Sequence, residues 1–277
     1  LGYTPIGINH LGDWGTQFGK LIFQFKQWGD KNELKKEPIK YLLKLYVKFH
    51  QQEEKNPKFS EHARKEFKKL EEGNKENIKL WKEFYNLSLK DFEKIYKRLN
   101  VKFDSYKGEA FYSKLTKKTV KKFKKVSRKS EGALIVEIND KNPPCILKKS
   151  DEASTYASRD LTAIFDREKQ YKPEKILYVV ASPQILHFQQ VFGTLAKINS
   201  KLAKKCIHIS FGLMNFKGEK LSTRKGKVIF MEDVLDKGKE LAKKIITKKN
   251  PKLKDKDEIA EKVAIASIIY SDLSHDR

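Results

Sequence analysis

The fold of this chain is decided by the apolar run Ile176-Leu177-Tyr178-Val179-Val180-Ala181. A near-continuous apolar run of this length is expected for a β-strand that is covered on both faces, as in a parallel sheet. A helical pattern of apolar residues follows over 185–198, and a second strand-like run, Cys206-Ile207-His208-Ile209-Ser210, comes after it. The order strand, helix, strand predicts a βαβ unit, and therefore an α/β fold with a Rossmann-like parallel sheet.

The N-terminal half of the chain has a different character. Residues 1–30 are rich in glycine and aromatic residues, and we expect a loop there that leads into Leu21-Ile22-Phe23-Gln24-Phe25. From 31 to 100 the apolar residues recur at helical spacing among many charges, which predicts an inserted helical region. Within it, Ser88-Leu89-Lys90-Asp91 resembles a capping box and predicts that a helix begins at this point.

Two further patterns complete the expected architecture. Ala133-Leu134-Ile135-Val136-Glu137-Ile138 predicts a short strand, which the turn residues Asn139-Asp140 end. Residues 232–248 and 255–275 predict two closing helices. The chain of 277 residues is 39% hydrophobic, which is enough for a buried core.

The composition is strongly basic. The formal net charge of +24 favours an anionic partner, for which nucleic acid is the obvious candidate. Lys and Arg total 60, and only seven of these are arginine, which leaves 53 lysines. Dedicated RNA-binding surfaces favour arginine, so a lysine-rich coding bias is an equally good explanation of the charge.

Cysteine content and hydropathy limit the cellular setting. Cys145 and Cys206 are far apart and match no metal-ligand spacing, so we predict no metal site and no disulfide scaffold. No apolar run approaches the ~20 residues that a membrane helix needs. We therefore expect a cytoplasmic protein without a membrane partner.

A segment near the start of the chain carries the first link to a known family. It is Asn9-His10-Leu11-Gly12-Asp13-Trp14-Gly15-Thr16-Gln17-Phe18-Gly19. It resembles the Asn-His-x-Gly-Asp-Trp-Gly-x-Gln-Phe-Gly segment of arginyl-tRNA synthetases. The resemblance implies that His10, Asp13 and Trp14 are neighbours of the substrate pocket.

One motif of that family is missing. In arginyl-tRNA synthetases an ATP-binding His-x-Gly-His motif precedes this segment. Here His10-Leu11-Gly12-Asp13 begins in the same way, but Asp13 stands where the second histidine belongs. The resemblance therefore implies a catalytic domain that is incomplete at both ends and inactive by itself. The helices of 232–277 would lead toward an anticodon-binding domain that is absent from the chain.

A second motif is Tyr156-Ala157-Ser158-Arg159-Asp160. If it opens a helix, Tyr156 and Asp160 share a face, where a carboxylate and an aromatic ring suit a guanidinium group. In the simpler interpretation this is a surface helix, and Asp160 pairs with Arg159 or Arg167. The motif resembles the Tyr-x-x-Arg-Asp of arginyl-tRNA synthetases, which implies that Asp160 holds the guanidinium of arginine and that Tyr156 lines the pocket. The family usually has Gly where this chain has Glu152.

A third motif follows the apolar strand directly, as Gln184-Ile185-Leu186-His187-Phe188. Gln184 and His187 would thus lie at the carboxyl end of a strand, where open α/β sheets bind ligands. By itself, His187 is better interpreted as a structural residue of a helix N-terminus. The resemblance to the Gln-x-x-His-Phe segment of the same family implies that Gln184 contacts the main-chain end of arginine and that His187 is a pocket neighbour.

The last motif is a lysine-rich loop bounded by glycines, which suits a mobile loop that closes on a triphosphate. Lysine-rich turns are common in this chain, so a plain surface turn is the simpler interpretation. The loop resembles the degenerate Lys-Met-Ser-Lys-Ser motif of arginyl enzymes, with Thr223 in place of the second lysine. The resemblance implies that Gly212 and Met214 border adenine, and it implies an ATP and pyrophosphate loop made of Lys220, Ser222, Thr223, Arg224 and Lys225.

Together the motifs identify the chain as an internal catalytic-core fragment of a eukaryotic-type arginyl-tRNA synthetase. The resemblance implies a monomer that ligates L-arginine to tRNA(Arg) through arginyl-adenylate and uses ATP with Mg²⁺. The alternative is a non-catalytic RNA-binding relic of such an enzyme, which retains the lysine surface only.

Overall fold

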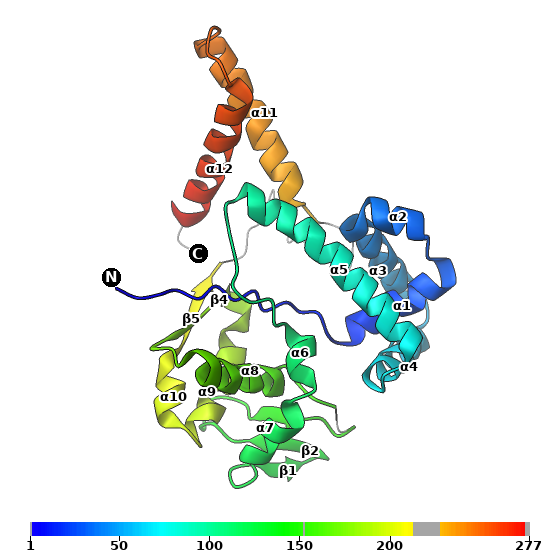
Figure 1. Ribbon diagram of the computed structural model, residues 1–277. Helices are drawn as coiled ribbons and strands as arrows, with labels where there is room; N and C mark the ends of the chain where they lie inside the picture. The colour runs from blue at the N-terminus through cyan, green and yellow to red at the C-terminus, as the bar shows by residue number, and fades with distance from the viewer. Residues whose placement is uncertain (1, 152, 213–227, 275–277) are drawn as a thin grey trace. The chain divides into compact units, whose positions relative to one another are not determined.

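The computed structural model describes residues 2–151, 153–212 and 228–274 (Figure 1). The chain divides into two compact units. The described residues of the first unit are 2–14 and 104–212, and those of the second are 15–103 and 228–274. Among all of these residues, no helix is both long and apolar enough to cross a membrane.

The first unit contains the expected parallel strands. β4 (Ile176–Ala181) pairs with β5 (Cys206–Phe211) in parallel, with Ile176 opposite Cys206. The chain passes from one strand to the other through a 3₁₀ turn, η2, and two helices. These elements are η2 (Ser182–Gln184), α9 (Ile185–Ala196) and α10 (Ser200–Lys205). The predicted α/β fold with a parallel βαβ unit is confirmed.

The expectation that this strand is covered on both faces is wrong for the described chain. Burial alternates along β4: Ile176 and Tyr178 are buried, whereas Leu177 is 57% and Val179 is 65% exposed. The buried side chains belong to one hydrophobic core, shared with α8 (Tyr156–Tyr171) and α9. The apolar run therefore has one packed face and one exposed face within these residues.

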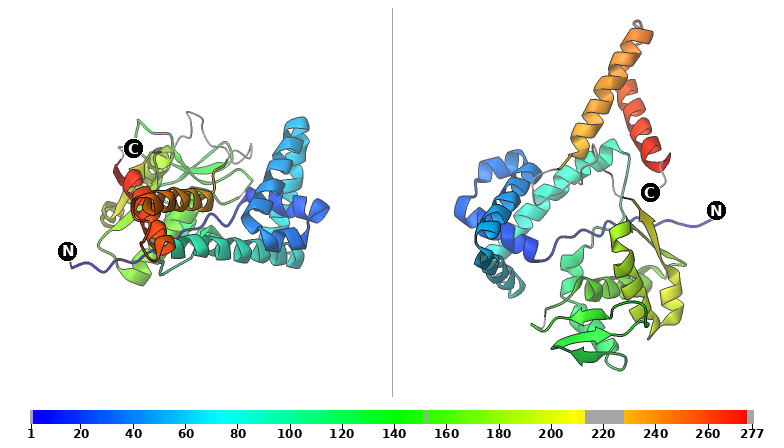
Figure 2. Two further views of the ribbon diagram at one scale, coloured as in Figure 1. Left: turned by 90° about the horizontal axis from the view of Figure 1, so that it is seen from above. Right: turned by 180° about the vertical axis from the view of Figure 1, so that it is seen from behind.

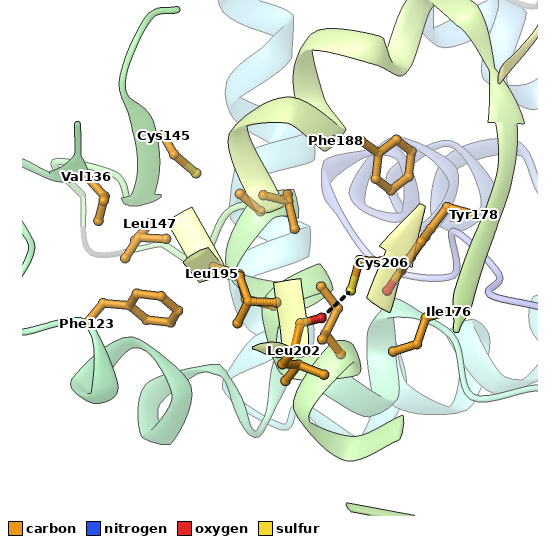
Figure 3. Packing of buried hydrophobic residues seen from close by; sticks show 14 residues of the cluster. Phe123, Val136, Cys145, Leu147, Ile176, Tyr178, Phe188, Leu195, Leu202 and Cys206 are labelled. Carbon is orange, nitrogen blue, oxygen red and sulfur yellow. Dashed lines mark hydrogen bonds between the residues drawn. The ribbon is translucent and has the colours of Figure 1, made fainter. Parts of the chain in front are cut away.

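The rest of the first unit is a small antiparallel sheet with two short helices. The sheet has the order β1 (Arg128–Ser130), β2 (Ala133–Val136) and β3 (Cys145–Lys148), and β2 is the strand predicted over 133–138. The helices are α6 (Glu109–Ser113) and α7 (Thr116–Lys122). Figure 3 shows the core that joins these parts, which includes Phe123, Val136, Cys145, Leu147, Tyr178, Phe188, Leu195 and Cys206. Both cysteines are free and buried.

The described part of the second unit is helical. Its helices are α1 (Thr16–Trp28), α2 (Lys31–Lys36), α3 (Pro38–Lys55), α4 (Ser60–Glu71), α5 (Lys75–Arg98), α11 (Met231–Lys249) and α12 (Lys256–Ser274), with a short 3₁₀ turn η1 (Pro57–Phe59) before α4. The helical region of 31–100 and both closing helices are confirmed. Figure 2 shows α11 and α12 as a helical hairpin.

Two local predictions in this unit are wrong. The expected loop of residues 1–30 is replaced by helix α1 from Thr16 onward. Two glycines that suggested a loop are instead required at the start of this helix and at its contact with α4. Gly15 precedes it with φ 130°, and Gly19 lies so close to the carbonyl oxygen of Ala63 in α4 that a Cβ would overlap it. The expected helix start at Ser88 also fails, since α5 continues through this residue without a break.

A polar cluster ties α1, α4 and α5 together inside the second unit. Lys26 Nζ lies 2.9 Å from Glu66 Oε2, and Asn77 Nδ2 donates to the same carboxylate at 2.9 Å. Burial opposes ionisation of Glu66, but the hydrogen bonds from Lys69, Lys26 and Asn77 outweigh it and lower its pKa to about 2. The cluster is therefore a charged, hydrogen-bonded core contact.

Candidate functional site

The site is built around the first two turns of α8. This helix begins with a capping box, in which Thr155 Oγ1 accepts from the Ser158 backbone N–H at 3.2 Å and Ser158 Oγ accepts from the Thr155 N–H at 3.0 Å. Thr155 Oγ1 also donates to the carbonyl of Ile146 in β3 at 2.7 Å. The start of α8 is thus fixed to the antiparallel sheet, with Tyr156 54% exposed and the Asp160 side chain 15% exposed.

Two histidines surround the carboxylate of Asp160. His187, in the first turn of α9, places Nε2 2.6 Å from Asp160 Oδ2. His10, from the N-terminal segment, places Nε2 3.6 Å from Oδ1. The sequence predicted both histidines as pocket neighbours, and the structure brings both to the carboxylate that it singled out.

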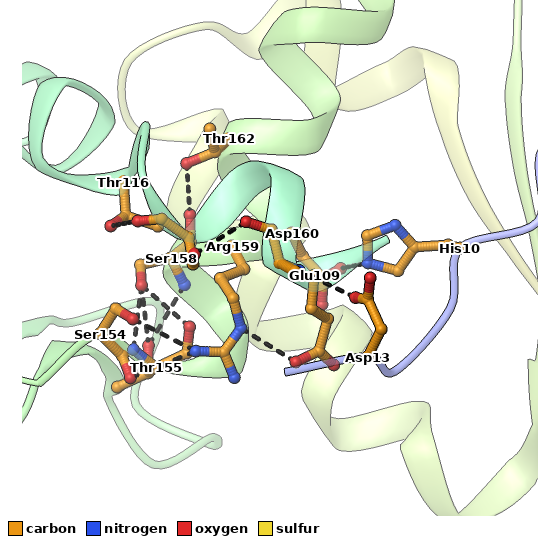
Figure 4. A network of polar contacts seen from close by, with 12 residues as sticks. His10, Asp13, Glu109, Thr116, Ser154, Thr155, Ser158, Arg159, Asp160 and Thr162 are labelled. Carbon is orange, nitrogen blue, oxygen red and sulfur yellow. Dashed lines mark hydrogen bonds and ion pairs between the residues drawn. The ribbon is translucent and has the colours of Figure 1, made fainter. Parts of the chain in front are cut away.

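Arg159 has a partner other than Asp160. Its Nε lies 3.1 Å from Glu109 Oε2 of α6, and NH1 donates to Ser154 Oγ at 3.2 Å (Figure 4). The guanidinium carbon lies 4.6 Å from the centre of the Tyr156 ring. The Arg159 side chain is only 6% exposed, so this is a buried ion pair with a stacked ring.

Arg167 is also engaged elsewhere. Its NH1 donates to the hydroxyl of Tyr178 at 3.0 Å, and its NH2 lies 3.1 Å from Nδ1 of His10. A guanidinium N–H can only donate, so Nδ1 of His10 accepts and Nε2 of the neutral ring carries the hydrogen. That N–H faces Asp160. The simpler interpretation, in which Asp160 pairs with Arg159 or Arg167, is therefore wrong.

The N-terminal segment is held in place by backbone contacts. The Asn9 N–H donates to the carbonyl of Ser105 at 2.9 Å, and the Glu109 N–H donates to the carbonyl of Leu11 at 3.0 Å. Asp13 Oδ1 accepts from the Ala110 N–H at 2.9 Å at the start of α6. These bonds bring His10 and Glu109 to α8 in one polar network (Figure 4).

Burial controls the ionisation of this network. Burial raises the pKa of Glu109 to about 7; Arg159 opposes the rise, whereas Asp160 and Asp13 add to it. Burial lowers the pKa of His10, and Asp160 only partly compensates. Burial also raises the pKa of Asp13 in spite of its backbone hydrogen bonds. His10 is therefore neutral at neutral pH, and Glu109 titrates there.

The remaining predicted site residues are not part of this polar network or lie outside the described residues. Trp14 is buried, Gln184 is exposed in η2, and Gly212 is half-buried just after β5. Six predicted ATP-site residues lie outside the described residues: Met214, Lys220, Ser222, Thr223, Arg224 and Lys225. Among the described residues, no group of three or more His, Cys, Asp or Glu side chains is arranged to hold a metal ion.

Sequence reasoning missed Glu109, and it considered Arg159 and Arg167 only as possible partners of Asp160. One signal could have found the arginines, because the chain has only seven of them among 60 basic residues. The planar guanidinium head can donate to several partners at once, so each of these few arginines was a candidate for a buried polar network. Glu109 has no comparable signal.

Comparison with known protein families supports the interpretation of the motifs. The family model described as tRNA synthetases class I (R), catalytic domain, matches residues 1–277. The chain is 49% identical over 279 aligned residues to an arginine–tRNA ligase of Clostridium perfringens, covering 100% of this chain and 49% of the relative. It is also 49% identical to an arginine–tRNA ligase of Clostridium botulinum, covering 50% of that protein. The chain thus spans about half the length of these curated relatives, and because they are bacterial, a eukaryotic-type enzyme is not supported.

Solved structures show the same fold. An arginyl-tRNA synthetase from Plasmodium falciparum superposes with a TM-score of 0.74 at 22% identity, over 98% of this chain and 45% of that one. The arginyl-tRNA synthetase of Thermus thermophilus gives 0.72 at 21% identity, over 96% of this chain and 51% of that one.

Proposed function

Because the chain belongs to the class I tRNA synthetase family represented by the arginine-specific catalytic domain, we propose that it forms part of an arginine–tRNA ligase. In the proposed reaction the carboxylate of arginine attacks the α-phosphate of ATP, which releases pyrophosphate and forms arginyl-adenylate. The arginyl group then passes to the 3′ end of tRNA(Arg). Positioning and charge stabilisation are sufficient for such chemistry, since no covalent intermediate with the protein is needed.

The observation that carries this proposal is the state of Asp160. It is a largely buried carboxylate whose neighbours on α8, Arg159 and Arg167, are bound by other groups. His187 holds one carboxylate oxygen at 2.6 Å. A carboxylate fixed in this way suits a guanidinium ligand, because two parallel N–H groups can bind it with fixed geometry.

Other site residues fit the same substrate. The exposed ring of Tyr156, one helical turn before Asp160, would cover the flat face of the guanidinium. Gln184 lies at the carboxyl end of β4, close in sequence to His187, and would bind the main-chain end of arginine. On the family resemblance we also propose a monomer.

The ATP site is proposed on resemblance alone. Lys220, Ser222, Arg224 and their neighbours would bind pyrophosphate, with Gly212 beside adenine. The described residues offer no cluster for a resident metal, so Mg²⁺ is proposed only as the counter-ion that ATP brings, and no step is assigned to it. Two free, buried cysteines suit a reducing compartment such as the cytoplasm.

The tRNA partner is supported by a local excess of cations on α7 and its flanks. The seven lysines of residues 114–125 have no acidic partner among the described residues, and all are exposed. Several lie at i, i+4 spacing, where like charges destabilise a helix by about 0.2–0.5 kcal/mol per pair. A phosphate backbone would relieve this repulsion. These lysines are Lys114, Lys117, Lys118, Lys121, Lys122, Lys124 and Lys125.

The proposed organisation follows the same family resemblance. Residues 31–100 would form a helical insertion in the catalytic domain. The hairpin of α11 and α12 would lead toward an anticodon-binding domain, which the greater length of the curated relatives can accommodate.

The test is arginine-dependent ATP–pyrophosphate exchange by the complete polypeptide, with and without tRNA(Arg). We expect exchange that requires arginine, and a rise in the Michaelis constant for arginine of about a hundredfold or more for Asp160→Asn, since loss of a buried charged partner costs roughly 2–5 kcal/mol. An unchanged Michaelis constant would remove Asp160 from its role. Tight tRNA binding without any exchange would instead support the RNA-binding relic.

A further inference from the structure

Arg167 is a buried guanidinium that contacts neutral groups. It lies two turns after Asp160 on α8 and is only 5% exposed. Its NH1 donates to the Tyr178 hydroxyl at 3.0 Å, and its NH2 lies 3.1 Å from Nδ1 of His10. Asp160 is on the other side of the same ring, with Oδ1 3.6 Å from Nε2 of His10. The imidazole therefore bridges a buried cation and a largely buried anion.

The contact with Arg167 restricts the protonation of His10. A guanidinium nitrogen can only donate, so Nδ1 of His10 must keep its lone pair to accept. A doubly protonated ring would bring two N–H donors and two positive charges into contact at 3.1 Å in a buried place. Arg167 thus opposes the charged form of His10 by geometry and by charge. The single hydrogen of the neutral ring is then on Nε2, toward Asp160.

Asp160 favours the opposite state of the ring, because a nearby carboxylate stabilises an imidazolium. Burial lowers the pKa of His10, Asp160 raises it, and Arg167 lowers it again. Other groups that face His10 or its carboxylate are the guanidinium of Arg159, the backbone of Lys107, the stacked ring of Tyr112 and the imidazole of His187. Arg167 is the cation that contacts the ring directly.

We propose that Arg167 is a positioning residue that holds His10 as a neutral ring with its hydrogen on Nε2, so that the charge of Asp160 stays available to the guanidinium of arginine. This inference rests on the proposed arginine-ligase function. Without the guanidinium of Arg167, His10 would take up a proton from solvent and form an ion pair with Asp160. Arginine would then have to displace that partner and would bind more weakly.

The first experiment determines the protonation state of His10 in the complete polypeptide. The method is ¹⁵N NMR of protein labelled in histidine, and the variant His10→Gln assigns the signal. We expect Nε2 to be protonated and Nδ1 to be unprotonated in the wild type at neutral pH. An imidazolium, or a neutral ring with its hydrogen on Nδ1, would overturn the inference. The wild-type spectrum keeps the inference falsifiable if Arg167→Gln does not fold.

The second experiment measures the Michaelis constants for arginine and for ATP in the exchange assay with tRNA(Arg). It compares Arg167→Gln with the wild type at about pH 6 and about pH 8.5, on either side of the ordinary histidine pKa. Groups that are present in both proteins, such as His187, cancel at each pH. Arg128→Gln is the matched control, since Arg128 is an exposed arginine of the same unit and pairs with Glu137.

We expect Arg167→Gln to raise the Michaelis constant for arginine about tenfold at the lower pH, the scale of one charged hydrogen bond. The increase should shrink to about threefold or less at the higher pH, where the ring is neutral without help. The constant for ATP should not change, and Arg128→Gln should behave like the wild type. In the double variant with His10→Gln, the extra pH dependence should disappear, because no ring remains to be protonated.

Three results would overturn the role of Arg167. One is an unchanged constant for arginine, and another is an equal loss at both pH values, which indicates structural support only. The third is an extra pH dependence that persists in the double variant, because Arg167 then does not act through His10. Failure of the proposed function is distinct: the wild type shows no arginine-dependent exchange, whereas the NMR spectrum still reports the state of His10.

Discussion

The buried carboxyl of Glu109 makes the stability of the first unit depend on pH. Its pKa is about 7 in the folded protein, against 4.5 for an ordinary glutamate. The folded protein therefore binds this proton more tightly than the unfolded chain does. The stabilising contribution of Glu109 is complete below about pH 4.5 and is lost as the pH rises through about 7.

The size of the effect follows from the two pKa values. A difference of 7 minus 4.5 is 2.5 units, and at about 1.36 kcal/mol per unit this amounts to about 3 kcal/mol. Gln at position 109 does not titrate, so Glu109→Gln should lack this dependence. His10 and Asp13 also have shifted pKa values in this network. Both residues are present in the wild type and in the variant, so their contributions to the pH dependence of stability largely cancel in the comparison.

The measurement is urea unfolding of the complete polypeptide between pH 4.5 and pH 8. Hydrogen exchange of peptides from α8 reports the unfolding of the first unit. We expect the free energy of unfolding of the wild type to fall by about 3 kcal/mol relative to Glu109→Gln over this range. If the free energies of unfolding of the wild type and Glu109→Gln changed with pH in parallel, the buried Glu109 carboxyl would not have a pKa near 7.

Two further predictions concern other parts of the chain. Gly19→Ala should destabilise the second unit by about 1–3 kcal/mol, because the new Cβ meets the carbonyl of Ala63. Gly238→Ala on α11 should destabilise less than Gly19→Ala in the same thermal unfolding assay, because its Cβ would meet the Cβ of Ala264 at 3.3 Å, a tight contact that requires only a small shift, while alanine favours the helix. Replacing three unpaired α7 lysines with Gln should lower the slope of log K for tRNA(Arg) against log salt by about 2–3, whereas three lysines paired with acids should change it little. The first set is Lys117, Lys118 and Lys121, and the charge-matched control set is Lys237, Lys244 and Lys262.

Local patterns in the sequence were sufficient for the elements that position the site. The apolar runs at 176–181 and 206–210 are strands in the structure, and Tyr156 does open a helix. The loop expected at residues 1–30 failed because a glycine in a helix contact and a glycine in a loop look alike in sequence. Gly19 is needed for the close approach of α4, which only the fold reveals.

The partners of Asp160 could not be predicted in the same way. The sequence placed His10 near the pocket only through family resemblance, and it placed His187 there also through its position after an apolar strand. Their contacts with Asp160 depend on segments far apart in the chain. Glu109 is harder still, because an acidic residue at the start of a short helix ordinarily serves the helix dipole. Its ion pair with Arg159 becomes visible only when α6 and α8 are brought together in the fold.

The choice of histidine beside Asp160 follows from the charge of the chain. With 60 basic residues against 36 acidic ones, a carboxylate readily forms an ion pair with lysine, as Glu66 does with Lys26 and Glu240 does with Lys244. A carboxylate whose charge is already paired with lysine is poorly suited to bind a cationic ligand. A neutral imidazole can face a carboxylate with an N–H without cancelling its charge, and His10 is such a ring, because burial lowers its pKa. His10 thus adds no positive charge beside Asp160, which is the electrostatic condition that the proposed binding of a guanidinium group requires.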